Sequence, residues 1–412
     1  MISKIKISLI NYVSVAFKAI VIVALILPTT YPCKAEIIDF LANCSNNQCL
    51  SKPNNIAVSN DGNHLLTIDS SANPYIRKIK ITASGFTEDG IIPLNISNTN
   101  STEFEIDISE DNKKALVYGK PNGQSGVLLI VDLATNAIKS LRSLDSDSPL
   151  PNSISFLDSE GKKIITGNSN ASQGKLFIVN TENDQVEKTI NIKDTPNSVK
   201  VSPKYKYAVI TYRGVSNQTA TVYDLETGDS KDFETPPDIF FLVHNFLFSN
   251  SFNLLGTRTV ISSIGGNHVL HLLDLKNKKM VVKILNPNTD GLTLSAIYPD
   301  GSKVISAGIN NTSPVTIKVY KTDISNPLSP NILKTITIND STSIVDLDIS
   351  TDQQKLFILT LKGSNKVLKV FSLKDLTLIN EYVVSTNKLD TKLIISPDSR
   401  YGAIPLPKPD SN

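Results

Sequence analysis

The chain has 412 residues, of which 40% are hydrophobic and 19% are charged, and its formal net charge is +2. This is a globular composition, and it excludes a disordered or fibrous protein. Because the net charge is small, there is no general footprint for nucleic acid, and we expect no nucleic-acid partner.

Residues 1–35 have the pattern of an export signal. Basic residues come first, an uninterrupted apolar run from Ala19 to Leu27 follows, and Cys33-Lys34-Ala35 offers small residues to a signal peptidase. We therefore predict cleavage after Ala35 and a secreted or periplasmic protein without stable membrane insertion. The alternative is an uncleaved anchor, because the segment from Ile7 to Leu27 is almost long enough to span a bilayer.

Residues 36–50 contain a short strand candidate, Glu36 to Leu41, and then two cysteines. Two closely spaced thiols in an exported chain most often form a disulfide, and a metal site would need more ligands than this pair supplies. We predict a disulfide between Cys44 and Cys49, with no metal ion and no cofactor.

Residues 51–405 repeat one pattern at intervals of about 48 residues. Each unit has an inner strand, a tight polar turn and three more short strands, as in the copy that begins at Pro196 and ends at Gly228. Seven copies are complete, and an eighth has only its first two strands. The inner strands are expected at 56–59, 104–109, 153–157, 196–201, 246–249, 295–298, 345–350 and 393–396.

A period of this length with four short strands is typical of a β-propeller blade. The sequence predicts an all-β protein, a β-propeller of four-stranded antiparallel blades. Eight inner strands predict eight blades, with seven as the alternative. We expect Glu36 to Leu41 to complete the last blade, so that the ring closes by pairing of the N- and C-terminal segments. Residues 406–412 form a Pro-rich tail.

Two turn motifs recur along the repeats. The turn between the first and second strands contains Asp61, Asp300 or Asp398 next to Gly, Pro or Ser, which are residues that favour tight turns. After the third strand, an aspartate precedes a turn whose backbone amides it can bind, at Asp132, Asp224 and Asp274. Because these aspartates recur as a set, we predict that they are structural and not catalytic.

Three units carry a resemblance to a known family: Pro-Asn-Ser-Val-Lys-Val-Ser-Pro (196–203), Val-Tyr-Asp-Leu-Glu-Thr-Gly (222–228) and Tyr-Pro-Asp-Gly-Ser-Lys-Val-Ile-Ser (298–306). They resemble the YVTN-type β-propellers, which are related to the WD40 and lactonase-like propellers. The resemblance implies the blade architecture over nearly the whole chain after residue 35. The wider group includes exported binding proteins, surface-layer proteins and sugar-lactone hydrolases.

The aromatic run from Phe240 to Phe248 is the most unusual segment of the repeats. One interpretation is an inner strand buried on both faces. The other is an apolar contact surface at the mouth of the channel. The candidate ligand or partner residues there are Phe240, Phe241, His244 and Phe246, together with the cations Arg213 and Arg258.

Two functions are compatible with these patterns. The first is an exported, monomeric scaffold that binds a protein, peptide or glycan at one face of the ring or at the channel mouth, since the repeats are intact and no catalytic constellation stands out. The second is a lactonase-like hydrolase of a small sugar lactone, which requires His, Arg and Glu to converge at the channel mouth.

Overall fold

The computed structural model describes most of the repeat region and two short N-terminal stretches. The described residues are 20–24, 36–39, 53–69, 73–82, 85–96, 104–119, 127–141, 149–168, 174–202, 207–212, 220–233, 242–248, 254–260, 268–274, 279–286, 294–298, 300–310, 314–326, 331–385, 393–396 and 401–405. No helix of bilayer-spanning length and hydropathy occurs among them. Cys44 and Cys49 lie outside them, so the predicted disulfide remains a prediction.

Six four-stranded antiparallel sheets form blades in which consecutive strands lie side by side. The first three are β3 (Pro53–Val58), β4 (His64–Asp69), β5 (Tyr75–Thr82) and β6 (Gly85–Pro93); β7 (Phe104–Ile108), β8 (Lys114–Gly119), β9 (Val127–Asp132) and β10 (Ile138–Ser140); and β11 (Pro149–Phe156), β12 (Lys163–Asn168), β13 (Lys175–Asn180) and β14 (Gln185–Asn191).

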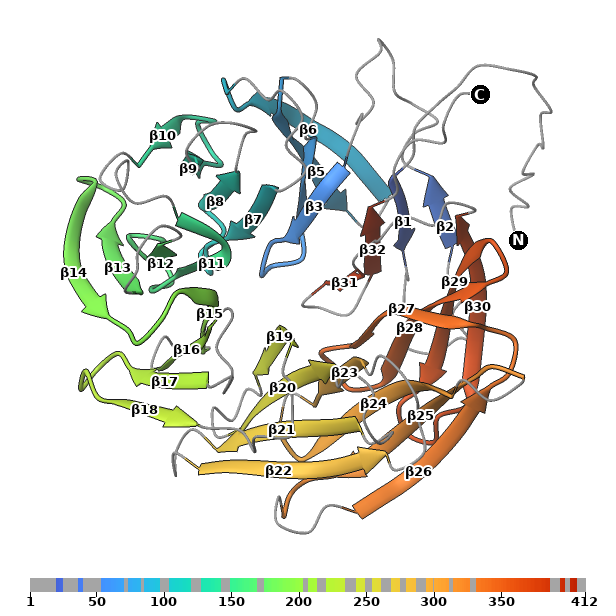
Figure 1. Cartoon of the computed structure of the whole chain (residues 1–412). Coiled ribbons are helices and arrows are strands. Elements are labelled where there is room, and N and C mark those ends of the chain that lie inside the picture. The colour runs from blue at the N-terminus through green and yellow to red at the C-terminus, as the bar shows by residue number, and fades with distance from the viewer. Residues whose placement is uncertain are drawn as a thin grey trace.

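The other three blades have the same strand order. They are β15 (Pro196–Val201), β16 (Tyr207–Tyr212), β17 (Ala220–Asp224) and β18 (Ser230–Phe233); β23 (Leu294–Ile297), β24 (Lys303–Asn310), β25 (Thr316–Asp323) and β26 (Asn331–Ile338); and β27 (Ser343–Ile349), β28 (Lys355–Lys362), β29 (Asn365–Ser372) and β30 (Leu378–Ser385). In Figure 1 the first strand of each blade lies toward a common centre, and β14, β26 and β30 lie at the rim.

The predicted count of eight blades, and the alternative of seven, is corrected to six blades whose packed faces the structure describes. Two further four-stranded sheets occur. The first consists of β19 (Leu242–Phe248), β20 (Leu254–Val260), β21 (His268–Asp274) and β22 (Lys279–Asn286), and only its backbone is described. The second is not a repeat unit. Counting inner strands overestimates the number of blades, because the last strand counted, β31 (Ile394–Ile395), belongs to the sheet that joins the two ends of the chain.

The sheet that is not a repeat unit has the order β2-β1-β32-β31 and joins the two ends of the chain. Its strands are β1 (Ile20–Ala24), β2 (Glu36–Asp39), β31 (Ile394–Ile395) and β32 (Tyr401–Pro405). The strand beside the C-terminal hairpin is β1 and not Glu36 to Leu41 as predicted, with Val21 opposite Ile404. The run Ile-Val-Ile-Val-Ala has a higher strand propensity than Glu-Ile-Ile-Asp, which explains why it takes the inner place.

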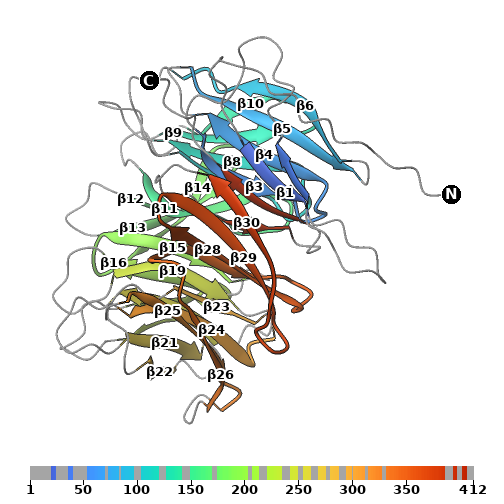
Figure 2. The same ribbon diagram turned by 90° about the vertical axis from the view of Figure 1, so that its right-hand side faces the viewer.

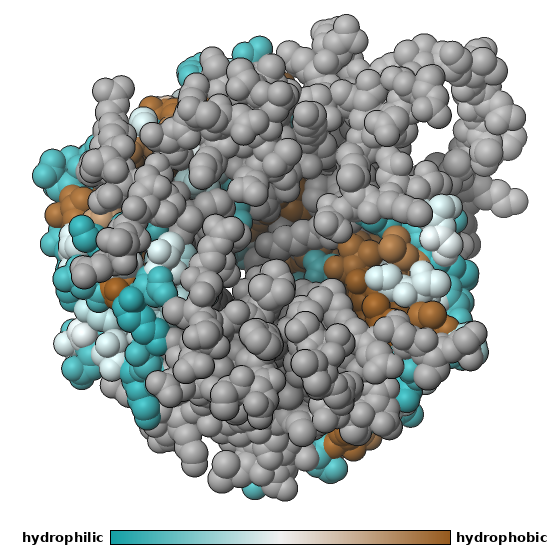
Figure 3. Space-filling view, in the orientation of Figure 1, coloured by the Kyte–Doolittle hydropathy of each residue, from teal (hydrophilic) through white to brown (hydrophobic). Residues whose placement is uncertain are grey.

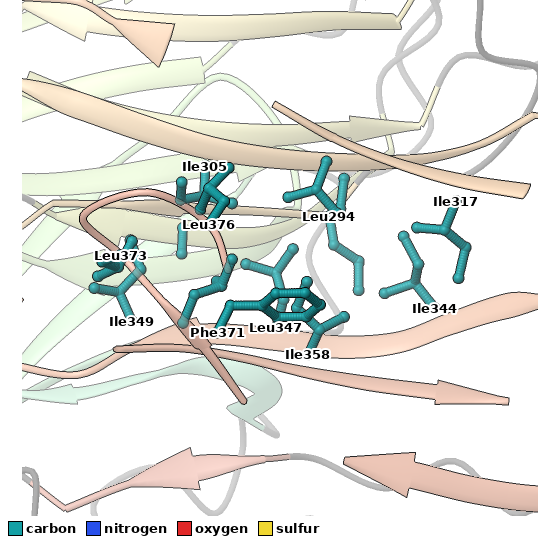
Figure 4. Close-up of a cluster of buried hydrophobic side chains, with 14 of the residues drawn as sticks. Leu294, Ile305, Ile317, Ile344, Leu347, Ile349, Ile358, Phe371, Leu373 and Leu376 are labelled. Carbon is teal, nitrogen blue, oxygen red and sulfur yellow. The ribbon is translucent and has the colours of Figure 1, made fainter. Parts of the chain in front are cut away.

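Apolar side chains fill the spaces between neighbouring blades. One cluster between the blades β23–β26 and β27–β30 contains Leu294, Ile305, Leu347, Phe371 and Leu376, all at most 6% exposed. Figure 4 shows these side chains converging from both sheets. Similar clusters lie between the other adjacent blades from β3 to β18. Because a blade exposes both of its faces, it buries them only by stacking on its neighbours.

The turns have the chemistry that the sequence predicts. The carboxylate of Asp132 accepts hydrogen bonds from the amides of Ala134 (3.0 Å) and Thr135 (2.7 Å). Asp224 accepts from two amides of its own turn in the same way, each at 3.0 Å. The structural role predicted for these two aspartates is therefore confirmed, whereas Asp274 belongs to β21, whose side chains are not described.

In three blades a buried serine makes the same pair of bonds in the turn between the first and second strands. The hydroxyl of Ser350 donates to the carboxylate of Asp352 (2.6 Å) and accepts from the amide of Lys355 (2.9 Å). Ser59 and Ser109 make the corresponding pairs of bonds in the first two blades. The hydroxyl thus satisfies a backbone donor that would otherwise lack a partner inside the protein.

Candidate functional site: an apolar outer edge on two neighbouring blades

Four of the six blades have a β-bulge at the same position of the outermost strand. In each, the ladder between the third and fourth strands skips one residue, which is Asp89 in β6, Glu187 in β14, Leu333 in β26 and Ile379 in β30. A bulge leaves the extra residue out of the ladder and re-aims its side chain. The recurrence allows one structural position to be compared between blades.

In the blades β3–β6 and β11–β14 the bulge residue is acidic and has a lysine partner. The Nζ of Lys78 lies 3.4 Å from Oδ2 of Asp89, and the Nζ of Lys163 lies 2.7 Å from Oε2 of Glu187. Hydrogen bonds from Lys163 and then Asn180 lower the pKa of the Glu187 carboxyl, so it is ionised at neutral pH. Charged outer strands of this kind discourage contact with other chains.

In the blades β23–β26 and β27–β30 the same position is aliphatic and exposed. Leu333 and Ile379 are 45% and 46% exposed, and the residues before them, Ile332 and Leu378, are 45% and 51% exposed. Val383, further along β30, is 57% exposed. These five residues are called the outer-edge surface below. Among the described residues, the only other large hydrophobic side chain with comparable exposure is Val186, beside Glu187.

The outer-edge surface lies on the rim of the ring. In Figure 1, β26 runs along the lower rim and β30 along the right-hand rim. Figure 2 shows β30 and β26 on the side turned toward the viewer, with β30 above β26. Figure 3 shows an apolar area between the central hollow and the right-hand edge and a smaller apolar area at the lower rim, whereas much of the described surface is hydrophilic.

A lysine bridge connects the two blades that carry the outer-edge surface. Lys321 lies on β25, directly opposite Lys334 and next to the bulge at Leu333. Its Nζ donates hydrogen bonds to the carbonyl oxygens of Leu373 (2.6 Å) and Lys374 (3.2 Å) in the neighbouring blade. These carbonyls belong to the turn that leads into β30, so the two bulges lie on either side of this bridge.

An ion-pair network holds β30 in place beneath the surface. Lys369, only 3% exposed at its side chain, lies 3.0 Å from Oδ2 of Asp340 and 2.6 Å from Oε2 of Glu381. Lys362 binds the same two carboxylates at 2.8 and 3.2 Å. Partial burial alone would raise the pKa of Asp340, but the hydrogen bonds from both lysines outweigh it and lower the pKa to about 2. The charges of Glu381 and Asp340 are thus already neutralised.

Two exposed lysines border the outer-edge surface without such a partner. Lys334 follows Leu333, and Lys374 lies in the turn before Leu378. Within the described part of the chain, neither ammonium group has an ion-pair partner or a hydrogen bond. Asp375 follows Lys374 in the same turn, accepts a hydrogen bond from the hydroxyl of Thr377 (2.8 Å), and also acts electrostatically on Lys321.

The site residues predicted from the sequence lie elsewhere. Phe240, Phe241 and Arg213 are outside the described residues, and His244, Phe246 and Arg258 lie in β19 and β20, where only the backbone is described. The ladder pairs Val243 with Thr259 and Phe246 with Thr257, so the backbone of Arg258 lies opposite the segment of His244 and Asn245.

Sequence reasoning missed the outer-edge surface. The signal was present as two aliphatic pairs, Ile332-Leu333 and Leu378-Ile379, where another unit has Glu88-Asp89. Only the pairing of the third and fourth strands, with its bulge, shows that these pairs occupy one structural position. An aliphatic pair in a predicted strand is ordinarily taken as half core and half surface, so its exposure could not be seen from the sequence alone.

The described residues contain no group of three or more His, Cys, Asp or Glu side chains able to hold a metal ion. The inner strand β27 carries Asp346 and Asp348, each of which accepts a hydrogen bond from the amide of the next residue, at 2.9 and 2.8 Å. Asp346 also accepts from the amide of Leu393 (2.8 Å), which ties β27 to the C-terminal hairpin. These acids therefore have structural roles.

Comparisons with known proteins identify the fold but not a family. No protein-family model and no curated protein matches the chain. Among solved structures, the C-terminal WD40 domain of Sif2 is similar, with a TM-score of 0.57, 14% identity, and coverage of 96% of this chain and 99% of that one. Hydrazine synthase of Kuenenia stuttgartiensis is similar with a TM-score of 0.54, 13% identity, and coverage of 80% and 97%. The chain has a WD40-like β-propeller fold, while its resemblance to YVTN-type propellers stays a resemblance.

Proposed function

We propose that this protein is a non-catalytic binding scaffold and that its outer-edge surface contacts another protein. The observation that carries the proposal is the comparison of equivalent bulges. Two blades place a neutralised acid there, and two adjacent blades place exposed Leu333 and Ile379. Exposed aliphatic groups that gather on one part of a surface are typical of an interaction site.

The apolar side chains of the outer-edge surface could supply a sizeable part of the binding free energy. Burying a whole aliphatic side chain stabilises by about 1.5–3 kcal/mol. Since Ile332, Leu333, Leu378 and Ile379 are about half exposed, covering what remains would contribute roughly 3–6 kcal/mol. Association entropy offsets part of this, so a partner must add polar or backbone contacts as well.

The described titratable groups support a binding role better than a catalytic one. Asp132 and Asp224 bind their own turns, and Asp340 and Glu381 are paired with lysines. The lactonase hypothesis needs His, Arg and Glu side chains that converge at the channel mouth. No such convergence occurs among the side chains that the structure describes, so the proposal does not extend to hydrolysis.

The test compares variants of the full chain in affinity capture from the source cells. Leu333→Asp with Ile379→Asp places charges at the two aliphatic bulges, and Val186→Asp is the matched control on β14. We expect one protein to be retained by the wild type and the control and lost by the double variant. Retention by all three, or turnover of a sugar lactone by the wild type, would contradict the proposal.

Export of the scaffold is also part of the proposal, and it is supported by the signal pattern of residues 1–35. Cleavage after Ala35 would remove β1, which is the ladder partner of β2 among the described strands. A sheet of order β2-β1-β32-β31 therefore belongs to the uncleaved chain. The mass of the protein recovered outside the cytoplasm distinguishes a chain that begins at Glu36 from one that retains β1.

A further inference from the structure

The outer-edge surface combines apolar side chains with lysines that have no ion pair within the described residues, and this combination specifies the chemistry of what binds it. In the blade β3–β6, Lys78 donates to the carbonyl oxygen of Leu133 (2.7 Å) in the next blade and lies 3.4 Å from the bulge acid Asp89. Lys321 is its structural equivalent and makes the same kind of bond to the next blade. Its bulge residue, however, is Leu333, so the carboxylate is missing.

Two further lysines add positive charge to this region. Lys334 and Lys374 flank Leu333 and the start of β30, and neither has a described ion-pair partner. Most acids of the same region have partners, because Glu381 and Asp340 belong to the ion-pair network and Asp323 accepts hydrogen bonds from Ser325 (2.6 and 2.9 Å). Asp375 accepts a hydrogen bond from Thr377, and its charge also acts on Lys321. Since Lys321, Lys334 and Lys374 outnumber Asp375, the surface presents a net positive charge beside aliphatic side chains.

Resting on the proposed function, we infer that the occupant of the outer-edge surface is an acidic, extended peptide segment of a partner protein with aliphatic side chains. Aliphatic groups would cover Leu333 and Ile379, and carboxylates would reach Lys321, Lys334 and Lys374. An extended segment fits because β26 and β30 are paired on one side only, so their outward backbone groups are open to strand addition.

Charge disfavours a second copy of this chain as the occupant. A symmetric dimer formed through the outer-edge surface would place the same patch on both sides of the interface. The lysines of one copy would then lie near those of the other, and Asp375 alone would offset only part of their charge. Like charges directly opposed across an interface suppress such a partner.

The experiment measures binding of short fluorescein-labelled peptides to the full chain by fluorescence anisotropy. One peptide alternates Leu with Glu, the second alternates Leu with Lys, and the third alternates Ala with Glu. We expect the Leu-Glu peptide to bind about tenfold or more tightly than either of the others, and more weakly as salt increases. Equal binding of the Leu-Glu and Leu-Lys peptides would overturn the inference.

The second part of the experiment reverses the charge of two lysines on the surface. Lys334→Glu with Lys374→Glu should exchange the preference, so that the Leu-Lys peptide binds better than the Leu-Glu peptide. Leu333→Ser with Ile379→Ser should weaken both peptides, and Val186→Ser is the matched control without effect. Circular dichroism establishes that each variant is folded, which is expected because all these side chains are exposed.

The outcomes separate this inference from the proposed function. If the captured protein is lost by the aspartate double variant but no peptide distinguishes the lysine variants, the scaffold stands and the acidic partner is wrong. If the Leu-Glu peptide binds but Val186→Ser abolishes it, the location is wrong. Dimerisation in sedimentation that Leu333→Ser removes would show a second copy as the occupant and overturn the inference.

Discussion

Leu376 provides a test of how the blade turns and the core between blades are coupled. It has a φ of 55°, in the left-handed region that disfavours side chains, yet it is 3% exposed within the cluster between the blades β23–β26 and β27–β30. Figure 4 shows it beside Ile305. Equivalent turns elsewhere use Asn136, Asp184 or Gly228, which tolerate this conformation better.

The expected result is an inverted order of stability. Leu376→Ala removes the buried side chain, at a cost of about 2–5 kcal/mol, and leaves the backbone strain in place. Leu376→Gly removes the same side chain but relieves a strain of roughly 1–2 kcal/mol, which exceeds the extra chain entropy of glycine of about 0.5–1 kcal/mol. The glycine variant should therefore be the more stable by about 1 kcal/mol, although both are less stable than the wild type.

Urea unfolding followed by far-UV circular dichroism measures this difference, because the chain has no tryptophan for fluorescence. A glycine variant with a higher midpoint than the alanine variant at equal slope supports the reasoning. An alanine variant equal to or more stable than glycine would mean that the backbone conformation at this turn carries no strain.

Three further expectations concern the same scaffold. Ser350→Ala should cost about 1–3 kcal/mol in urea unfolding, because it leaves the partly buried backbone amide of Lys355 without its acceptor, whereas the exposed Thr342→Ala should change little. The pKa of Asp340 is lowered to about 2 from its ordinary 3.8, so its ionised carboxylate contributes fully to the stability of the fold above about pH 4, and this contribution is lost as the pH falls toward 2. Because the carboxylate is 39% exposed, solvent screening reduces the contribution to about 1 kcal/mol. Asp340→Asn should therefore make stability depend less on pH between about pH 4 and pH 2. Gly119→Ala should destabilise by about 1–3 kcal/mol, because its Cβ would lie 2.0 Å from the ring of Phe104, and Phe104→Leu in the same chain should recover part of the loss.

The repeat pattern was sufficient to predict the propeller architecture and the roles of its turn residues. The predicted strands of the unit from Pro196 to Gly228 match β15 to β18 to within a few residues. Asp132 and Asp224 have the structural role that their recurrence indicates. These features depend on local chemistry, namely turn residues, alternation of side chains and spacing, which a single sequence contains.

The blade count, the closing strand and the outer-edge surface were decided by tertiary structure. Whether β1 or β2 lies beside β32 depends on competition between distant segments, and the sequence gives no measure of that competition. The bulges at Leu333 and Ile379 depend on the register between two strands. A slip of one residue would turn these side chains to the other face, so only the paired strands determine that they are exposed.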